Sequence, residues 1–95
     1  MTNTPPELSD YDFLELVAFD AKVDWEGFDY AFEEYPPRFE SRELQAVADD
    51  YSGLKALRAA HLEKIQSFWQ EDGAMSRYDR HLDAADKRRS RRKCL

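Results

Sequence analysis

The chain has 95 residues, of which 42% are hydrophobic and 14% aromatic, and its formal net charge is -6. A chain of this length forms one domain with a single small core, which excludes an enzyme with a large enclosed active site. Its one cysteine, Cys94, excludes an internal disulfide framework. The first residues lack the pattern of a signal peptide and no apolar run is long enough to cross a bilayer, so we expect a cytoplasmic protein without a membrane partner.

Charge is distributed unevenly along the chain. Residues 1–50 contain 14 acidic and 3 basic side chains, whereas residues 87–95 contain 6 basic and no acidic ones. The stretch between them is close to neutral, with 6 acidic and 5 basic side chains. An acidic segment attracts basic protein surfaces and repels nucleic acid, and a basic segment does the reverse.

The first predicted helix starts near Ser9, after a loose lead-in over residues 1–8 that contains a proline pair. Ser9 followed by Asp12 resembles a capping box, in which the serine oxygen accepts a backbone N–H and acids lie at the positive end of the helix. Apolar residues then recur at helical spacing. They are Phe13, Leu14, Leu16, Val17, Ala18 and Ala21.

Two more short helices are expected in the acidic half. Asp24 is placed to cap the second helix, and the proline pair at 36–37 stops it. Its predicted core face is the aromatic stripe Trp25, Phe28, Phe32 and Tyr35. Ser41 caps the third helix, and Gly53 is its expected C-terminal stop. The apolar residues of this third helix are Leu44, Val47, Ala48 and Tyr51.

The fourth predicted helix is the longest and the fifth leads into the basic tail. The fourth begins near Ser52 and ends at Gly73, with the stripe Leu54, Leu57, His61, Leu62, Ile65, Phe68 and Trp69. The fifth has a weaker stripe at Met75, Tyr78, Leu82 and Ala85. The sequence thus predicts an all-α fold, a small bundle of four to five short helices over residues 9–86, with a basic C-terminal tail over 87–95.

One segment matches part of a calcium-loop pattern. Counted from Lys22, positions three, five, six and twelve are Asp24, Glu26, Gly27 and Glu33. Position one of that pattern requires a carboxylate and here holds a lysine. A capped aromatic helix accounts for more residues of this segment, so we expect no metal site.

The two histidines, His61 and His81, give no catalytic pattern. Neither has a second histidine or a cysteine at ligand spacing, and the sequence indicates no nucleophile held against either of them. We expect His61 at the edge of the core and His81 on the surface, in a protein without enzymatic activity and without a cofactor.

The acidic residues of the second predicted helix form a candidate binding face. Glu26, Asp29 and Glu33 share one side of it, and helical neighbours lie about 5 to 6 Å apart, comparable to successive phosphates of a nucleic-acid strand. Such a face can imitate nucleic acid and occupy a basic protein groove, and the charge pattern resembles that of small acidic phage inhibitor proteins. The alternative is a solvated face that keeps the protein soluble. The candidate partner-binding residues are Asp20, Asp24, Glu26, Asp29, Tyr30, Glu33 and Glu34, with Tyr30 as an aromatic anchor.

The basic tail is the second candidate site. Its cations are Lys87, Arg88, Arg89, Arg91, Arg92 and Lys93, which can bind the phosphates of nucleic acid in a salt-dependent way. No aromatic residue interrupts the run, so base stacking is not indicated. Alternatively, the tail is a solubilising end, or it pairs with the acidic half of its own or of a neighbouring chain. The oligomeric state stays open, a dimer included.

Between positions 20 and 69, several residues match the pattern of a known family. They are Lys22, Val23 and Asp24, then Ala31, Phe32 and Glu34, a proline soon after, and a later helix that opens with Leu54. In these residues the chain resembles the theta subunit of bacterial DNA polymerase III and its phage and plasmid relatives. The resemblance implies a small three-helix protein without catalytic activity that binds the proofreading exonuclease subunit. This chain departs from the family in its acidity, its proline pair and its extra basic helix, which leaves the partner open.

Together these patterns predict a non-enzymatic protein-binding module, either an inhibitor or an accessory subunit, whose acidic helical surface docks on a basic protein. The alternative is a nucleic-acid-binding accessory protein that uses the basic tail.

Overall fold

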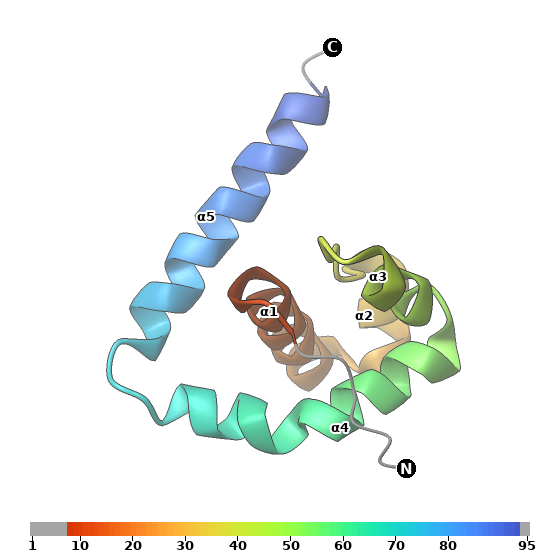
Figure 1. Ribbon diagram of the computed structural model, residues 1–95, viewed down its shortest axis with the longest axis horizontal. Helices are drawn as coiled ribbons and strands as arrows, with labels where there is room; N and C mark the ends of the chain where they lie inside the picture. Colours follow the sequence, from red (N-terminus) through yellow and green to blue (C-terminus); the bar gives the residue numbers. More distant parts are fainter. Residues whose placement is uncertain (1–7, 94–95) are drawn as a thin grey trace.

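The computed structural model describes residues 8–93, with side chains described for residues 8–87. Within that part of the chain five α-helices and no strands form a small bundle, which confirms the predicted all-α class. The helices are α1 (Asp10–Glu26), α2 (Phe28–Glu34), α3 (Arg42–Ala48), α4 (Tyr51–Trp69) and α5 (Ala74–Lys93). Helix α1 is central, because α2, α4 and α5 all pack against it, and α3 packs on α4 (Figure 1).

Helix α1 starts where the sequence predicts and ends later than predicted. The Ser9 hydroxyl accepts the Asp12 backbone N–H at 3.2 Å, as expected for an N-cap. The helix continues through Asp24 to Glu26, so the prediction that Asp24 caps a second helix is wrong. It ends at Gly27, whose φ of 92° and ψ of 159° are accessible almost only to glycine. This turn redirects the chain into α2.

The break at Gly27 divides the predicted aromatic stripe. Phe28 faces the core from α2, and its ring meets the buried Phe19 of α1 edge-on, with centroids 5.4 Å apart. Trp25 precedes the break and follows the phase of α1, which leaves its side chain 86% exposed. The expectation of Trp25 in the core is therefore wrong. The prediction extended one helical periodicity across Gly27, which requires a single continuous helix. The chain forms two helices there instead.

Gly53 joins α3 to α4 closely and does not end α3. Helix α3 ends at Ala48, and the Asp50 carboxylate caps α4 by accepting the Gly53 N–H at 2.9 Å. A Cβ atom at position 53 would lie 2.4 Å from the Val47 carbonyl oxygen, so only glycine permits this approach. Tyr51, expected on the third helix, is instead the first residue of α4.

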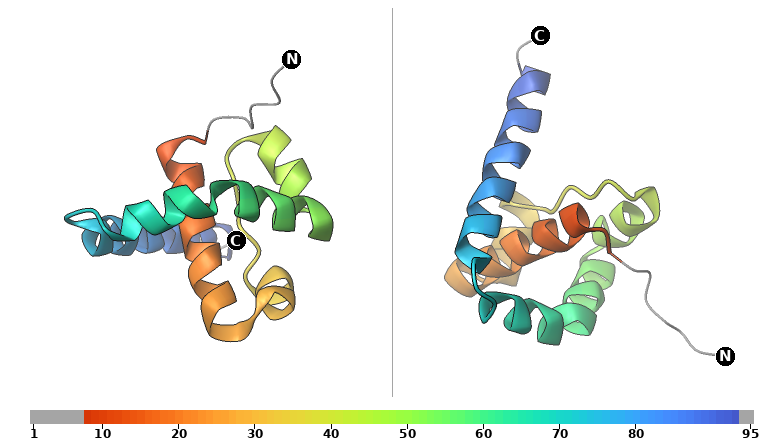
Figure 2. Two further views of the ribbon diagram at one scale, coloured as in Figure 1. Left: turned by 90° about the horizontal axis from the view of Figure 1, so that it is seen from below. Right: turned by 60° about the vertical axis from the view of Figure 1, so that its left-hand side comes forward.

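The core takes residues from all five helices and from the connection between α2 and α3, and α4 crosses α1 along one side of the bundle (Figure 2). The α4 stripe follows the predicted helical spacing, with Leu54, Leu57, His61, Ile65 and Phe68 buried. The hydrophobic core consists of Leu16, Val17, Phe19, Ala31, Phe39, Leu44, Ala48, Leu54, Leu57, Ile65, Phe68 and Ala74.

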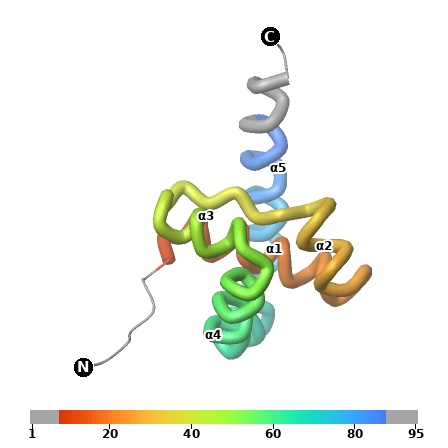
Figure 3. The backbone as a smooth tube through the Cα atoms, turned by 90° about the vertical axis from the view of Figure 1, so that its right-hand side faces the viewer, coloured from red at the N-terminus to blue at the C-terminus, as the bar shows by residue number. Residues whose placement is uncertain are grey.

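Helix α5 packs through a face that matches the predicted stripe only in part. Ala85 is buried and Tyr78 packs against the core, as predicted, whereas Met75 is 61% exposed and Leu82 is 40% exposed. The other buried positions are Ala74 and His81, which an apolar pattern overlooks because one side chain is small and the other is polar. Beyond that contact α5 rises away from the other helices, as Figures 1 and 3 show.

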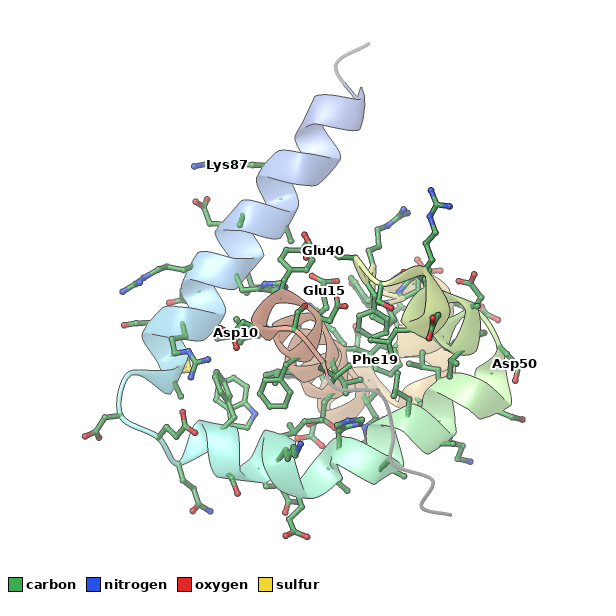
Figure 4. All side chains as sticks on the ribbon, viewed as in Figure 1. Asp10, Glu15, Phe19, Glu40, Asp50 and Lys87 are labelled. Atoms are coloured by element: carbon green, nitrogen blue, oxygen red, sulfur yellow. The ribbon has the colours of Figure 1, made fainter. Side chains whose placement is uncertain are left out.

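Two buried carboxylates of α1 hold the connection between α2 and α3. Asp12 accepts the backbone N–H groups of Glu40 and Ser41, at 2.7 and 3.3 Å. Glu15 accepts the Arg38 N–H at 2.9 Å through Oε1, while its Oε2 lies 2.5 Å from His81 Nε2 (Figure 4). These side chains fix the connection and α5 on the same helix.

Candidate functional site

One exposed surface of the described residues is the corner at which α1 ends and α2 follows. It carries three exposed aromatic rings: Trp25 is 86% exposed, Tyr30 47% and Tyr35 37%. Exposed carboxylates accompany them on both helices. We call this surface the acidic-aromatic corner, and it consists of Asp24, Trp25, Glu26, Tyr30, Glu33, Glu34 and Tyr35.

Contacts that cross Gly27 connect several members of the corner. Trp25 and Glu26 follow Lys22 by three and four residues on α1, so both are neighbours of Lys22 on the helix surface. The Lys22 Nζ lies 4.5 Å from the centroid of the Tyr35 ring, and that ring lies 6.1 Å from the Tyr30 ring. The charge of Glu26, followed by Tyr35 and partial desolvation, raises the pKa of Tyr30. Contacts across Gly27 therefore join α1 and α2 into a single surface.

The corner carboxylates lie at helix ends that disfavour them. Asp24 and Glu26 fall in the last turn of α1, Glu33 and Glu34 in the last turn of α2, and neither last turn contains a basic residue. The C-terminal end of a helix carries partial negative charge, so each exposed acid there costs about 0.3–1 kcal/mol at low salt. Helix stability does not account for these acids.

The structure removes Asp20 from the predicted site. Asp20 is only 8% exposed, and its Oδ1 accepts a hydrogen bond from Arg58 Nε at 2.6 Å. The expectation of an exposed Asp20 is wrong because Arg58, 38 residues later in the chain, reaches it from α4. Asp20 and Arg58 join two helices and have no free charge to offer a partner.

Asp29 is exposed but already engaged. Its carboxylate accepts a hydrogen bond from the Tyr51 hydroxyl of α4. That bond, with partial desolvation and the negative charge of Asp29, raises the pKa of Tyr51. The predicted stripe of Glu26, Asp29 and Glu33 is thus not one helix face, since Glu26 belongs to α1 and Asp29 points to α4. Of the predicted partner-binding residues, the corner keeps Asp24, Glu26, Tyr30, Glu33 and Glu34.

His81 is the clearest polar residue that the sequence misplaced. It was expected on the surface, yet it is 5% exposed and pairs with the buried Glu15. Its ring also meets Tyr11 edge-on, with centroids 4.7 Å apart. No sequence signal identifies this pair, because its members are 66 residues apart. Each is also a polar residue, which a sequence pattern assigns to the exposed side of its helix. The pair holds α5 on α1.

His61 lies at the edge of the core, as predicted, beside an open groove of about 420 Å³. Its Nδ1 donates to the Leu57 carbonyl oxygen at 3.0 Å, so in the neutral ring Nε2 is the acceptor. Phe68 also lines the groove, and the Arg77 guanidinium lies 5.2 Å from its ring centroid while it pairs with Glu71. The groove lining carries charges of both signs and favours no single ligand class.

The calcium-loop pattern does not form a loop. Residues 22–26 belong to α1 and residues 28–33 to α2, so Asp24, Glu26 and Glu33 are held on two helices. Among the described residues, no three histidine, cysteine, aspartate or glutamate side chains converge to hold a metal ion.

The predicted basic tail continues α5 as a helix to Lys93. Lys87 is exposed, and its Nζ lies 3.3 Å from the Asp83 carboxylate one turn earlier. The side chains of Arg88, Arg89, Arg91, Arg92 and Lys93, named above as candidate phosphate ligands, lie outside the described ones.

No protein-family model matches this chain, and neither the curated proteins nor the solved structures contain a match to it. The described helices include none that is both long enough and apolar enough to span a membrane.

Proposed function

We propose that the protein is a non-enzymatic binding module that docks its acidic-aromatic corner on a basic protein partner, as an inhibitor or an accessory subunit. The observation that carries the proposal is Trp25, 86% exposed in the last turn of α1. Tryptophan is highly buried on average, and it is enriched among the residues that dominate binding energy at interfaces. The accessory form of the proposal is the one that the resemblance to the theta subunit family implies.

The charges around Trp25 indicate the partner's chemistry. Four exposed carboxylates occupy the ends of α1 and α2, where they oppose the helix dipoles. A partner that brings cations to this surface offsets that unfavourable interaction. Charge complementarity also accelerates association, because it steers the two proteins toward the correct encounter.

Lys22 provides an example of the contact that we expect the partner to make. Its ammonium group lies over the Tyr35 ring at 4.5 Å from the centroid. A lysine or arginine of the partner can take the same position on Trp25, with Glu26 beside it as a counter-ion. Aromatic rings among acids thus fit a basic protein surface.

The test compares two charge reversals of equal size. Glu26→Lys with Glu34→Lys changes the corner, and Asp72→Lys with Asp79→Lys changes two exposed acids, one before α5 and one on it. Wild-type protein and both variants, each checked for folding by circular dichroism, are used to capture proteins from a host lysate. Captured proteins are then purified, and their dissociation constants are measured at two salt concentrations.

We expect a basic protein that binds wild type and the control variant equally and binds the corner variant at least about tenfold more weakly, chiefly through a slower association rate. Trp25→Ala should also weaken this complex, because it removes the aromatic anchor. If the purified partner binds the corner variant with unchanged affinity and salt dependence, the corner is not the docking surface.

A further inference from the structure

The chain itself contains an arginine-rich segment that has the properties proposed for the partner of the acidic-aromatic corner. Residues 87–95 hold six cations, four of them arginines, and no acid. Arginine stacks on aromatic rings and pairs with carboxylates through a planar fork of donors, whereas lysine offers only a point charge. The corner presents three exposed rings and four exposed carboxylates. The two surfaces are complementary in charge and in kind.

The path of α5 keeps this segment away from the corner of its own chain. Helix α5 is fixed on α1 by the contact of His81 with Glu15, and it continues without a break to Lys93. Twelve residues of helix span about 18 Å, in the direction in which α5 leaves the bundle (Figure 1). The corner lies at the C-terminal end of α1, about 16 Å along that helix from Glu15. Figure 4 shows Lys87 on the part of α5 that is remote from α2.

We propose that the arginine-rich segment of a second copy of this chain occupies the acidic-aromatic corner, so that copies associate head to tail. The inference rests on the proposed function, since it names one occupant of the same surface. Such a contact joins two different surfaces, and its repetition gives open chains of copies where the rotation does not close a ring. Self-association of this kind competes with a foreign basic partner, and the protein is released for that partner as it is diluted.

The decisive experiment is complementation between two variants. The corner variant carries Glu26→Lys and Glu34→Lys, and the tail variant carries Arg88→Gln, Arg89→Gln, Arg91→Gln and Arg92→Gln. Sedimentation velocity is measured with a reductant present, because of Cys94, at about 0.03 M and about 0.5 M salt, which change the screening length several-fold. The charge-reversal control at Asp72 and Asp79 is measured beside them.

We expect wild type and control to form concentration-dependent oligomers at low salt that dissociate at high salt. Each of the two variants alone should be a monomer, and an equimolar mixture of them should form a one-to-one complex. That complex stops at two copies, because the mixture contains one intact corner and one intact tail per pair. Oligomers of the corner variant alone, or a mixture that stays monomeric, would overturn the inference.

A second measurement reports on the corner itself. In a Trp69→Phe background, Trp25 is the one remaining tryptophan. A synthetic peptide with the sequence of residues 86–95 is added to the tail variant in this background, and Trp25 fluorescence is followed. We expect a saturable change in fluorescence as the peptide binds. The affinity of the peptide should be at least about tenfold weaker after Glu26→Lys with Glu34→Lys, and also at high salt. The inference would be contradicted if Trp25 fluorescence did not change at any peptide concentration. It would also be contradicted if the peptide bound nucleic acid and did not bind the corner.

The tail variant also separates this inference from the proposed function. Because its corner is intact, it should still capture the foreign basic partner. A wild-type protein that captures the partner but does not self-associate refutes only the head-to-tail contact, whereas the absence of any corner-dependent foreign partner refutes the proposed function.

Discussion

The contact between Glu15 and His81 allows a quantitative test of how α5 is held. Both side chains are almost completely buried, at 5% and 2% exposure, and their Oε2 and Nε2 atoms are 2.5 Å apart. The Glu15 Oε1 atom also accepts the Arg38 N–H. The substitution Glu15→Ala therefore leaves a buried histidine and a backbone N–H without their partner. Each buried donor left without its partner costs about 1–3 kcal/mol, and more where the group is charged, so the two losses together amount to about 3–5 kcal/mol.

That loss is a large fraction of the stability expected for a domain of this size. Natural domains gain about 0.05–0.15 kcal/mol per residue, which gives on the order of 5–14 kcal/mol here. With a urea dependence of about 1–3 kcal/mol per molar, the unfolding midpoint should fall by about 2 M. Urea unfolding followed by circular dichroism measures this change. The control Glu63→Ala removes an exposed glutamate of α4 and should change stability by less than about 0.5 kcal/mol.

A milder substitution separates the charge from the hydrogen bond. Glu15→Gln keeps an oxygen that can accept the Arg38 N–H, so its cost should be smaller, about 1–3 kcal/mol. A double-mutant cycle of Glu15→Gln with His81→Gln then gives the coupling between the two positions. A loss below about 1 kcal/mol for Glu15→Ala, or a coupling near zero, would refute the reasoning that this pair anchors α5.

Three further predictions follow from single contacts. Gly27→Ala should destabilise the protein by about 1–3 kcal/mol in urea unfolding, because its backbone conformation is nearly restricted to glycine, although a Cβ there meets no atom within 4 Å. Phe19→Ala should cost about 3–5 kcal/mol, whereas Trp25→Ala should stay within about 0.5 kcal/mol of wild type, because only the first ring is buried. The raised pKa of Tyr51 contributes stability that is complete below the ordinary value of 10.0 and is lost as pH rises through the raised value. Asp29→Asn should lower that pKa in a tyrosinate absorbance titration and reduce the loss of stability at alkaline pH.

Each of these predictions has a result that contradicts it. Equal stability of Gly27→Ala and wild type would mean that α1 and α2 join by a different turn. A large loss of stability in Trp25→Ala would place that ring in the fold and not on a docking surface. An unchanged tyrosine titration in Asp29→Asn would show that the carboxylate does not hold Tyr51 in solution.

The sequence by itself determined the local features of this protein. The cap at Ser9, the apolar stripe of α4 and the all-α class were predictable, because caps and helical periodicity involve residues only a few positions apart. The sequence likewise shows that acidic residues are concentrated in the first half of the chain and basic residues at its C-terminal end. These features placed the candidate binding surface in the first half of the chain.

Only the tertiary structure decided which acids belong to that surface. Asp20 and Glu15 are bound by Arg58 and His81, which are 38 and 66 residues away, and such pairings leave no periodic pattern in the sequence. The contact of His81 with the distant Glu15 decided which face of α5 is buried. The backbone turn at Gly27 decided that Trp25 is exposed. A carboxylate looks the same in a sequence whether it joins two helices or faces solvent, because its role depends on what the fold places opposite it.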